Sequence, residues 1–229
     1  MRKLPDALML FAAGFGTRMG ALTAACPKPL IKVAGKPLID HALDIIDETD
    51  IKTVVVNTHY LPDMLQTHLK DRAVFLSHEP DILETGGGLR NALPLLGHNP
   101  VFTFNTDAIW VGQNPLDALM AAWDPEKMDA LLMLVPPSAA KGYQGMGDFE
   151  LTADTTIRRG AGLIYSGAQI IKTNGISDIS QTKFSLNVLW DNLIDSGRVF
   201  GIQYDGSWCD VGTSTGIEVA EKMLGGVNV

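Results

Sequence analysis

The amino-acid sequence predicts an α/β protein whose central sheet is mixed but mostly parallel and is flanked by helices. Short, near-continuous apolar runs alternate along the chain with stretches in which apolar residues recur at helical spacing. Strands that are apolar on both faces are typical of a parallel sheet covered on both sides. Strand, helix and strand in repeated alternation favour that arrangement over separate sheet and helix regions.

The first half of the chain supplies most of this pattern. The apolar runs that we expect to form buried strands cover residues 8–13, 53–57, 74–77, 101–105 and 130–135. Helices are expected between them, over residues 37–46, 62–69, 89–96 and 115–123. Three of these helices would open with proline, which suits a first helical turn because the missing N–H has no partner there anyway.

The second half has a different texture. Residues 138–147 are rich in glycine, alanine and serine and predict a loop. Short strands are expected around 149–151, 162–165, 168–171 and 199–204, and helices over 187–194 and 216–224, the second stopped by Gly225 and Gly226. Because neither a repeat nor a dividing linker is visible, residues 1–229 are expected to form a single domain.

Composition excludes several classes of function. The net charge is −8 and no cluster of lysine and arginine is visible, which argues against nucleic-acid binding but not against nucleotides. Cys26 and Cys209 stand far apart, as expected of two reduced thiols. The apolar run at 8–13 is too short to span a membrane, so a cytoplasmic protein without membrane contact is expected.

Polar clusters follow three of the expected strands. They cover residues 14–28, 79–88 and 105–107. Ligands of open α/β sheets bind at the carboxyl ends of the strands, so these clusters are expected to converge on one site.

The first cluster contains glycines and two cations. Residues 12–20 read Ala-Ala-Gly-Phe-Gly-Thr-Arg-Met-Gly, and residues 27–30 read Pro-Lys-Pro-Leu. Glycines after a strand let backbone N–H groups approach phosphate oxygens. Arg18 offers a planar fork and Lys28 a compact charge, which suits phosphoryl transfer because charge spreads there over non-bridging oxygens.

Other interpretations of the glycines fit less well. The P-loop pattern is absent. A dinucleotide-binding fingerprint, as in an NAD-dependent oxidoreductase, needs G-x-G-x-x-G, whereas Gly14, Gly16 and Gly20 are spaced one residue too long. The second strand also ends in Asn57 and Thr58 instead of an acidic residue. Taken alone, the glycines could form a tight turn beside a surface arginine.

The glycine motif and the Pro-Lys-Pro-Leu motif together resemble the signature of nucleotidyltransferases that activate sugar 1-phosphates. The resemblance spans nearly the whole chain and implies a Rossmann-like nucleotidyltransferase fold. It implies that Arg18 contacts the departing phosphates and Lys28 the reacting ones. It also implies that the loop wraps the triphosphate through Ala13, Gly14, Gly16 and Thr17.

The second cluster, residues 79–88, reads Glu-Pro-Asp-Ile-Leu-Glu-Thr-Gly-Gly-Gly. Short side chains and backbone groups can fit a base edge, and a helix N-terminus favours nearby anions. The resemblance implies that Glu79 and Thr85 line the nucleotide pocket. The stretch from Leu83 to Gly88 is similar to that of bacterial N-acetylmuramate 1-phosphate uridylyltransferases. The alternative is a glycine-rich helix entry without a ligand.

Two aspartates are the expected Mg²⁺ ligands. Asn105, Thr106 and Asp107 close the fourth strand, and Mg²⁺ is bound by one or two carboxylates together with phosphate oxygens. The resemblance implies a nucleotide contact for Asn105 and a metal contact for Asp107, although relatives usually have glycine where Thr106 stands. It implies the second metal carboxylate for Asp210, whose alternative role is an N-cap or an Asx-turn before the last helix.

The sugar site is less defined by the sequence. Gly147, Asp148 and Asn187 match regions that hold the sugar in similar proteins and are candidates only. Arg158 and Arg159 could meet an acidic group on the sugar, but a solvated charged turn is the favoured interpretation.

The resemblance implies an Mg²⁺-dependent enzyme with a nucleoside triphosphate and a sugar 1-phosphate as its partners. The favoured pair is UTP and N-acetylmuramic acid 1-phosphate, for recycling of cell-wall sugar. A mannose- or heptose-1-phosphate guanylyltransferase is one alternative, and a non-catalytic sensor of nucleotide-sugars is another. A monomer or small homo-oligomer is expected.

Overall fold

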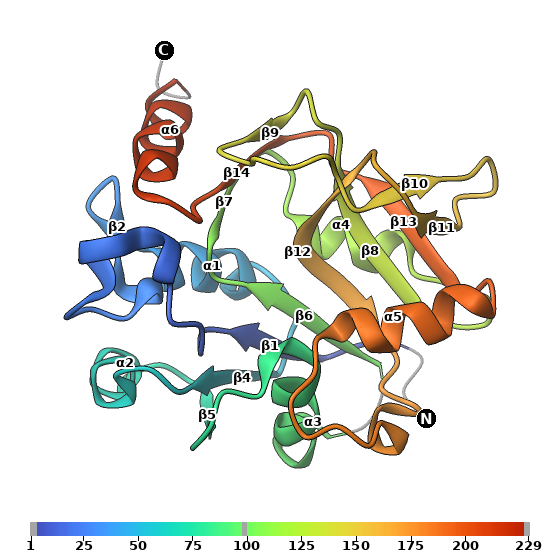
Figure 1. The fold of residues 1–229 in the computed structure, drawn as a ribbon, viewed down its shortest axis with the longest axis horizontal. Helices are drawn as coiled ribbons and strands as arrows, with labels where there is room; N and C mark the ends of the chain where they lie inside the picture. Colours follow the sequence, from blue (N-terminus) through green and yellow to red (C-terminus); the bar gives the residue numbers. More distant parts are fainter. Residues whose placement is uncertain (1–3, 98–99, 227–229) are drawn as a thin grey trace.

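A seven-stranded sheet forms the centre of the protein in the computed structural model, which describes residues 4–97 and 100–226 (Figure 1). The strand order is β13-β8-β12-β6-β1-β4-β5. These strands are β1 (Ala7–Phe11), β4 (Thr53–Thr58), β5 (Phe75–His78), β6 (Val101–Asn105), β8 (Ala130–Val135), β12 (Ile164–Ile171) and β13 (Val199–Gln203). β12 runs antiparallel to β6 and β8, and the other pairs are parallel. The predicted mixed, mostly parallel sheet is confirmed.

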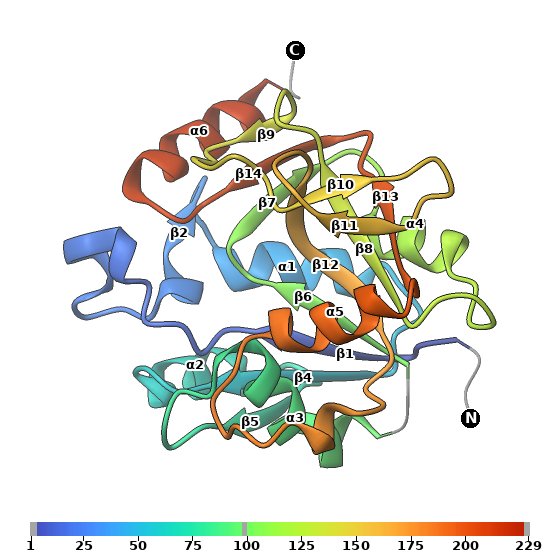
Figure 2. The same ribbon diagram turned by 45° about the vertical axis from the view of Figure 1, so that its right-hand side comes forward.

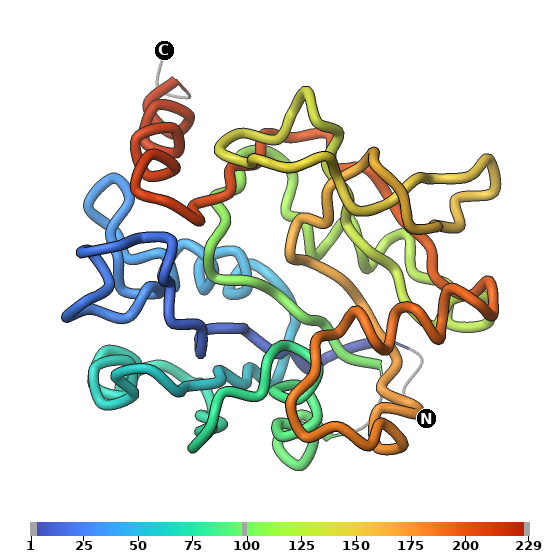
Figure 3. Tube along the Cα trace, in the orientation of Figure 1, coloured from blue at the N-terminus to red at the C-terminus, as the bar shows by residue number. Residues whose placement is uncertain are grey.

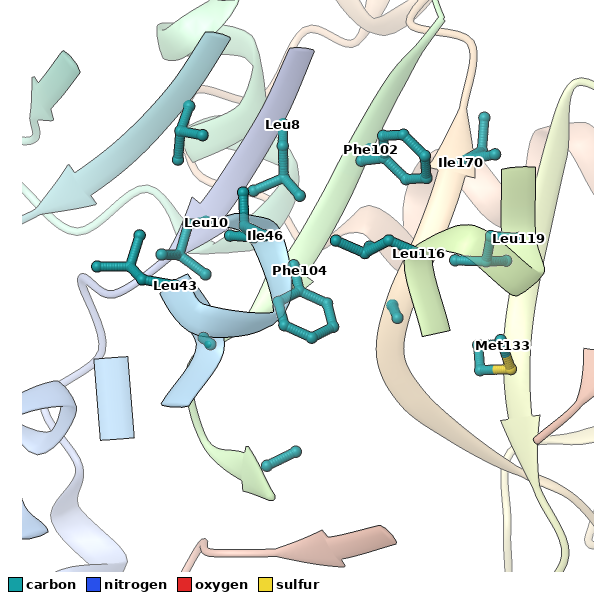
Figure 4. Close-up of a cluster of buried hydrophobic side chains, with 14 of the residues drawn as sticks. Leu8, Leu10, Leu43, Ile46, Phe102, Phe104, Leu116, Leu119, Met133 and Ile170 are labelled. Atoms are coloured by element: carbon teal, nitrogen blue, oxygen red, sulfur yellow. The ribbon is translucent and has the colours of Figure 1, made fainter. Parts of the chain in front are cut away.

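Helices cover both faces of this sheet. One face carries α1 (Leu38–Asp47), α2 (Pro62–Leu69) and α4 (Pro115–Ala122), and the other carries α3 (Glu84–Leu96) and α5 (Leu186–Asp195), which lie together in Figure 2. Alternation along β1 explains why both faces are apolar. Leu8 and Leu10 join the core beneath α1, shown in Figure 4, whereas Met9 joins the core beneath α3.

The segment after β1 packs against the end of the chain. It contains the 3₁₀ turns η1 (Thr17–Thr23) and η2 (Lys28–Leu30) and the hairpin β2 (Lys32–Val33) and β3 (Lys36–Pro37). Together with α6 (Ser214–Gly225) it forms a third, smaller core, and Figure 3 shows the red α6 near the blue segment that follows β1. Sequentially distant segments therefore meet at this edge.

Two small sheets complete the architecture. In the first, β14 (Ser207–Asp210) lies between β7 (Ala108–Val111) and β9 (Ala140–Lys141). The second pairs β10 (Phe149–Leu151) with β11 (Ile157–Arg159), and a short turn, η3 (Ile176–Asp178), precedes α5.

The structure departs from the sequence prediction in several places, and the short strands β2, β3 and β11 are among the elements that were not predicted. The expected strands at 162–165 and 168–171 are one strand, β12, whose register with β8 shifts between Tyr165 and Gln169. The expected loop at 138–147 contains β9, and the short strands β7 and β14 were not predicted. Helix α3 begins at Glu84, not at residue 89. Among the described residues, no helix has the length and apolarity to cross a membrane.

Candidate active site

The carboxyl ends of β1, β4, β5 and β6 surround one pocket, so the predicted convergence of the polar clusters is confirmed. Seven of the predicted site residues line it, and they come from all three clusters. They are Ala13, Gly14, Lys28, Glu79, Thr85, Asn105 and Asp107. The loop continues beyond the pocket with Gly16, Thr17 and Arg18. Asp210 is the last residue of β14.

Gly16 holds the loop close to Lys28. Its φ is +65°, a conformation that favours glycine, and a Cβ there would lie 2.8 Å from the Cβ of Lys28 and 2.9 Å from Cγ2 of Thr23. The Thr23 hydroxyl donates to the Gly16 carbonyl oxygen at 3.1 Å, and Thr17 begins η1 directly afterwards. The second glycine of the motif is therefore explained by close packing against the lysine stem.

Lys28 is aimed at Asp107. Its side chain is only 11% exposed, and its Nζ lies 2.7 Å from Oδ2 of Asp107. Burial on its own would raise the pKa of Asp107, but the charge and hydrogen bond of Lys28, with the charge of Arg18, outweigh it and hold that pKa below its usual value. Asp107 is therefore ionised at neutral pH.

The two predicted metal carboxylates are brought together by the β7–β14 ladder. Asp210 pairs with Ala108, the residue after Asp107, and the N–H of Val211 donates to the Asp107 carbonyl at 2.8 Å. Burial and the negative charge of Asp107 raise the pKa of Asp210, against the opposing effect of Lys28 and Arg18. The side chain of Arg18 is 64% exposed, and its Nη1 lies 3.8 Å from Oδ2 of Asp210.

Asp210 does not cap the last helix, but its carboxylate has a hydrogen bond with the backbone of Gly212, two residues on, which fits the alternative role in an Asx-turn. Thr213 occupies the N-cap of α6, and its side chain accepts a hydrogen bond from the N–H of Gly216. Asp210 is thus left beside Asp107, where the two carboxylates repel each other.

The donor set fits Mg²⁺ bound together with a substrate. Mg²⁺ needs only one or two carboxylates when phosphate oxygens complete its shell. Asp107 lines the pocket, and Asp210, on the neighbouring strand, is close enough for the two negative charges to interact. Across the described residues, no group of three or more His, Cys, Asp or Glu side chains is placed to hold a metal ion.

A buried network stabilises the wall formed by Glu79. Glu79 is fully buried, and its Oε1 accepts from Nδ2 of Asn57 at 2.7 Å, while Oδ1 of Asn57 accepts from the N–H of Ala12 at 2.7 Å. The other oxygen of Glu79 accepts from the N–H of Leu83 at 2.9 Å. Asn57 lines the pocket but was not among the predicted site residues. Its position at a strand end, after three valines, was the available signal.

The glycines of α3 are explained by packing, and the expected attraction of an anion to this helix N-terminus stays a prediction. The N–H groups of Gly86 and Gly87 donate to the carbonyl of Phe184 at 2.9 and 3.0 Å. A Cβ at Gly88 would lie 2.6 Å from Oε1 of Glu79. Glu84, which lines the pocket, has a φ of +60°, an uncommon conformation for a residue with a side chain.

Thr85 and Thr106 use their hydroxyl groups in the protein framework. Oγ1 of Thr85 accepts from the N–H of Leu186 at 2.9 Å and so connects α3 to the start of α5. Oγ1 of Thr106 donates to the carbonyl of Phe11 at 2.8 Å and joins the ends of β6 and β1. Thr106 therefore lines the pocket while its hydroxyl group is used in joining two strand ends.

A second pocket continues from the first. Phe11, Thr85 and Asn105 line both. Two of the candidate sugar contacts, Asp148 and Asn187, line the second pocket. Its remaining lining residues are Arg159, Tyr165, Ser185, Leu186 and Trp190.

The candidate sugar residues are held in place by the backbone around them. Oδ2 of Asp148 accepts from the N–H of Tyr165 at 2.9 Å, which leaves Oδ1 for another partner. Nδ2 of Asn187 donates to Oγ of Ser185 at 2.9 Å. Gly147 has a φ of +92° and lies against Gly162, so its contact with a sugar stays a prediction.

Comparison with known proteins identifies the family. Residues 8–141 match the MobA-like NTP transferase domain. The chain is 41% identical to the N-acetylmuramate alpha-1-phosphate uridylyltransferase of Caulobacter vibrioides, covering 98% of this chain and 99% of that protein. It is 33% identical to the protein of the same name from Neisseria meningitidis, covering 95% and 97%.

Solved structures show the same fold. HddC from Yersinia pseudotuberculosis, complexed with GMP-PN, superimposes with a TM-score of 0.77 at 21% identity, covering 96% of this chain and 99% of that one. A UDP-glucose pyrophosphorylase complexed with UDP-glucose superimposes with a TM-score of 0.81 at 15% identity, covering 98% and 100%. The chain thus belongs to the MobA-like NTP transferase family and, within it, to the sugar-1-phosphate nucleotidyltransferases.

Proposed function

We propose that this protein transfers UMP from UTP to N-acetylmuramic acid 1-phosphate and releases pyrophosphate. The observation that carries the proposal is the joined pair of pockets, in which Lys28 and Asp107 stand next to Asn105, a residue that lines both. One pocket would hold the nucleotide and the other the sugar, with the reacting phosphates between them. The near full-length likeness to two uridylyltransferases of that name supports the choice of substrates.

The chemistry requires positioning and charge stabilisation more than covalent catalysis. An oxygen of the sugar phosphate would attack the α-phosphorus of UTP, the bond to the β-phosphate oxygen would break, and pyrophosphate would leave. A phosphate anion is already a nucleophile, so no protein base is needed. Lys28 would stabilise charge on the reacting phosphates, and the exposed Arg18 would contact the leaving pyrophosphate as it departs towards solvent.

Asp107 and Asp210 would hold Mg²⁺ in this proposal. The ion would neutralise negative charge on the phosphate oxygens while bound to them. Lys28 donates to Asp107 in the structure described here, so part of that hydrogen bonding would be exchanged when substrate arrives. Because UTP is a cytoplasmic nucleotide, a cytoplasmic location goes with the proposal.

Pyrophosphate release distinguishes the proposal from its alternatives. Each nucleoside triphosphate would be combined with N-acetylmuramic acid, mannose and heptose 1-phosphates, with Mg²⁺ or with EDTA. We expect release with UTP and the first sugar, and none with EDTA. Release only with GTP and mannose or heptose 1-phosphate would indicate a guanylyltransferase. Binding of a nucleotide-sugar without release for any pair would indicate the sensor.

A further inference from the structure

The second pocket contains a guanidinium group held in a fixed position. Arg159 is the only lysine or arginine among the described residues that line this pocket. Its charged group lies 4.8 Å from the ring centre of Phe149 and 5.7 Å from that of Trp190. A guanidinium stacked on aromatic rings is confined to a plane, which suits directed recognition more than a mobile surface charge would.

Hydrogen bonds fix Arg159 within that plane. Its Nε and Nη2 each lie 2.8 Å from Oδ1 of Asp191 on α5, and Nη2 also donates to the carbonyl of Asn187 at 3.4 Å. Within the described part of the chain, Nη1 has no hydrogen-bond partner. The side chain is 39% exposed at the mouth of the pocket. One edge of the fork is thus anchored and the other remains able to bind a ligand.

The neighbouring arginine provides a contrast. Arg158 pairs with Glu150 across β10 and β11, its side chain is 69% exposed, and it does not line the pocket. In the same ladder Arg159 stands opposite Phe149. Because neighbouring residues of a strand point to opposite faces, the hairpin directs Arg159 inward and Arg158 outward. The sequence interpretation of a solvated charged turn therefore holds for Arg158 and not for Arg159.

We propose that Arg159 determines specificity by binding a carboxylate carried by the sugar 1-phosphate. This inference rests on the proposed function and extends it from a named sugar to the group that is recognised. N-acetylmuramic acid differs from N-acetylglucosamine by a lactyl ether that ends in a carboxylate. Carboxylates are the preferred partners of a guanidinium fork. Asp148, the one acidic residue among the described residues that line this pocket, would repel the carboxylate and accept a hydrogen bond from a sugar hydroxyl instead.

The test compares three sugar 1-phosphates, of which only one carries this acidic group. Pyrophosphate release with UTP would be measured for N-acetylmuramic acid 1-phosphate, its lactyl amide and N-acetylglucosamine 1-phosphate. Wild type, Arg159→Gln, Arg159→Lys and the control Arg158→Gln would be compared. We expect Arg159→Gln to lower the preference for the acid over the amide, as a ratio of kcat/KM, by on the order of 10²-fold. Arg159→Lys should recover part of this loss because it keeps the charge, and Arg158→Gln should retain the wild-type preference.

Two outcomes would overturn the role of Arg159, and a third would overturn only the choice of sugar. An Arg159→Gln protein that loses the acid and its amide to the same extent would reduce Arg159 to a structural support of α5. Wild type that uses the amide or N-acetylglucosamine 1-phosphate as well as the acid would show that no carboxylate is recognised. Wild type that instead uses another carboxylated sugar 1-phosphate, with the same loss in Arg159→Gln, would remove the muramate proposal and leave Arg159 as the carboxylate-binding residue.

Discussion

Two aspartates of this protein each interact with two basic side chains, yet they lie at opposite ends of the sheet's strands. Asp107 follows β6 and interacts with Lys28 and Arg18. Asp129 precedes β8 and contacts Lys172 at 2.8 Å and Arg198 at 2.6 Å. Because β6 and β8 both run antiparallel to β12, they point in the same direction. The end of β6 and the start of β8 therefore lie at opposite ends of the strands.

The two clusters differ in whether their basic side chains can reach a ligand. Lys172 donates to the carbonyl of Pro125 and Arg198 to that of Glu126, so the cluster around Asp129 ties two loops together. Lys28 faces the pocket, and Asp107 has a second carboxylate, Asp210, beside it. In both clusters burial would raise the pKa of the central aspartate and the cations lower it below the usual value. A paired aspartate therefore indicates function only when its partners face a pocket.

The largest effect is expected at Asp210. Asp210→Asn should lower turnover by on the order of 10³-fold, because the proposed Mg²⁺ ion would lose one of its two carboxylate ligands. The ion would then stabilise the charge on the reacting phosphates less well. The raised pKa of Asp210 means that its charge is unfavourable in the folded protein, so the free energy of unfolding should stay equal or increase. Steady-state kinetics and urea unfolding measure both. If Asp210→Asn lowered both the turnover and the free energy of unfolding by a large amount, Asp210 would be a structural residue, contrary to this prediction.

The two cations of the site should have smaller effects. Lys28→Ala should lower kcat by on the order of 10²-fold, as removal of a positioned charge-stabilising donor does. Arg18→Ala should have a smaller effect because its side chain is 64% exposed and screened by solvent. Single-turnover measurements with saturating UTP would test this order. Equal rates for wild type and Lys28→Ala would mean that the lysine only supports Asp107.

The cluster of Asp129, Lys172 and Arg198 should affect stability and leave turnover unchanged. Asp129→Asn should lower the free energy of unfolding by about 1–3 kcal/mol, because Lys172 and Arg198 lose a charged partner. Turnover at a temperature where the variant is folded should match that of wild type. If folded Asp129→Asn lost activity, the cluster around Asp129 would influence the active site, and its assignment as purely structural would be wrong.

The smallest expected effect is the pH dependence of the contribution that Asp129 makes to the free energy of unfolding. The pKa of Asp129 is lowered in the folded protein, so its stabilising effect is present above the unfolded value of about 3.9 and disappears as pH falls through the folded pKa. The difference in unfolding free energy between wild type and Asp129→Asn should be constant from about pH 5 to 8 and shrink below about pH 4. Acid-range urea titrations provide the measurement. A difference that persists at about pH 2 would assign the stabilisation to packing.

The sequence was most informative where binding residues follow a strand in one continuous run. The places of residues 12–14 and 105–107 at the pocket could be predicted because they directly follow a strand end. Asn57 was not predicted, and Arg159 could not be distinguished from Arg158, because their partners, Glu79 and Trp190, lie in other elements of the fold. The start of α3 was missed for a similar reason, since its glycines are helical through tertiary contacts with Phe184.

The central claim is that UMP is transferred to an acidic sugar phosphate at the Asp107–Asp210 edge of the sheet. The most direct test incubates UTP and N-acetylmuramic acid 1-phosphate with Mg²⁺ and wild type, Asp107→Asn or Asp129→Asn, and quantifies the nucleotide-sugar by mass spectrometry. We predict equal amounts of UDP-N-acetylmuramic acid and pyrophosphate from wild type and Asp129→Asn, and almost none from Asp107→Asn. Product formation by Asp107→Asn at the wild-type rate would contradict the claim.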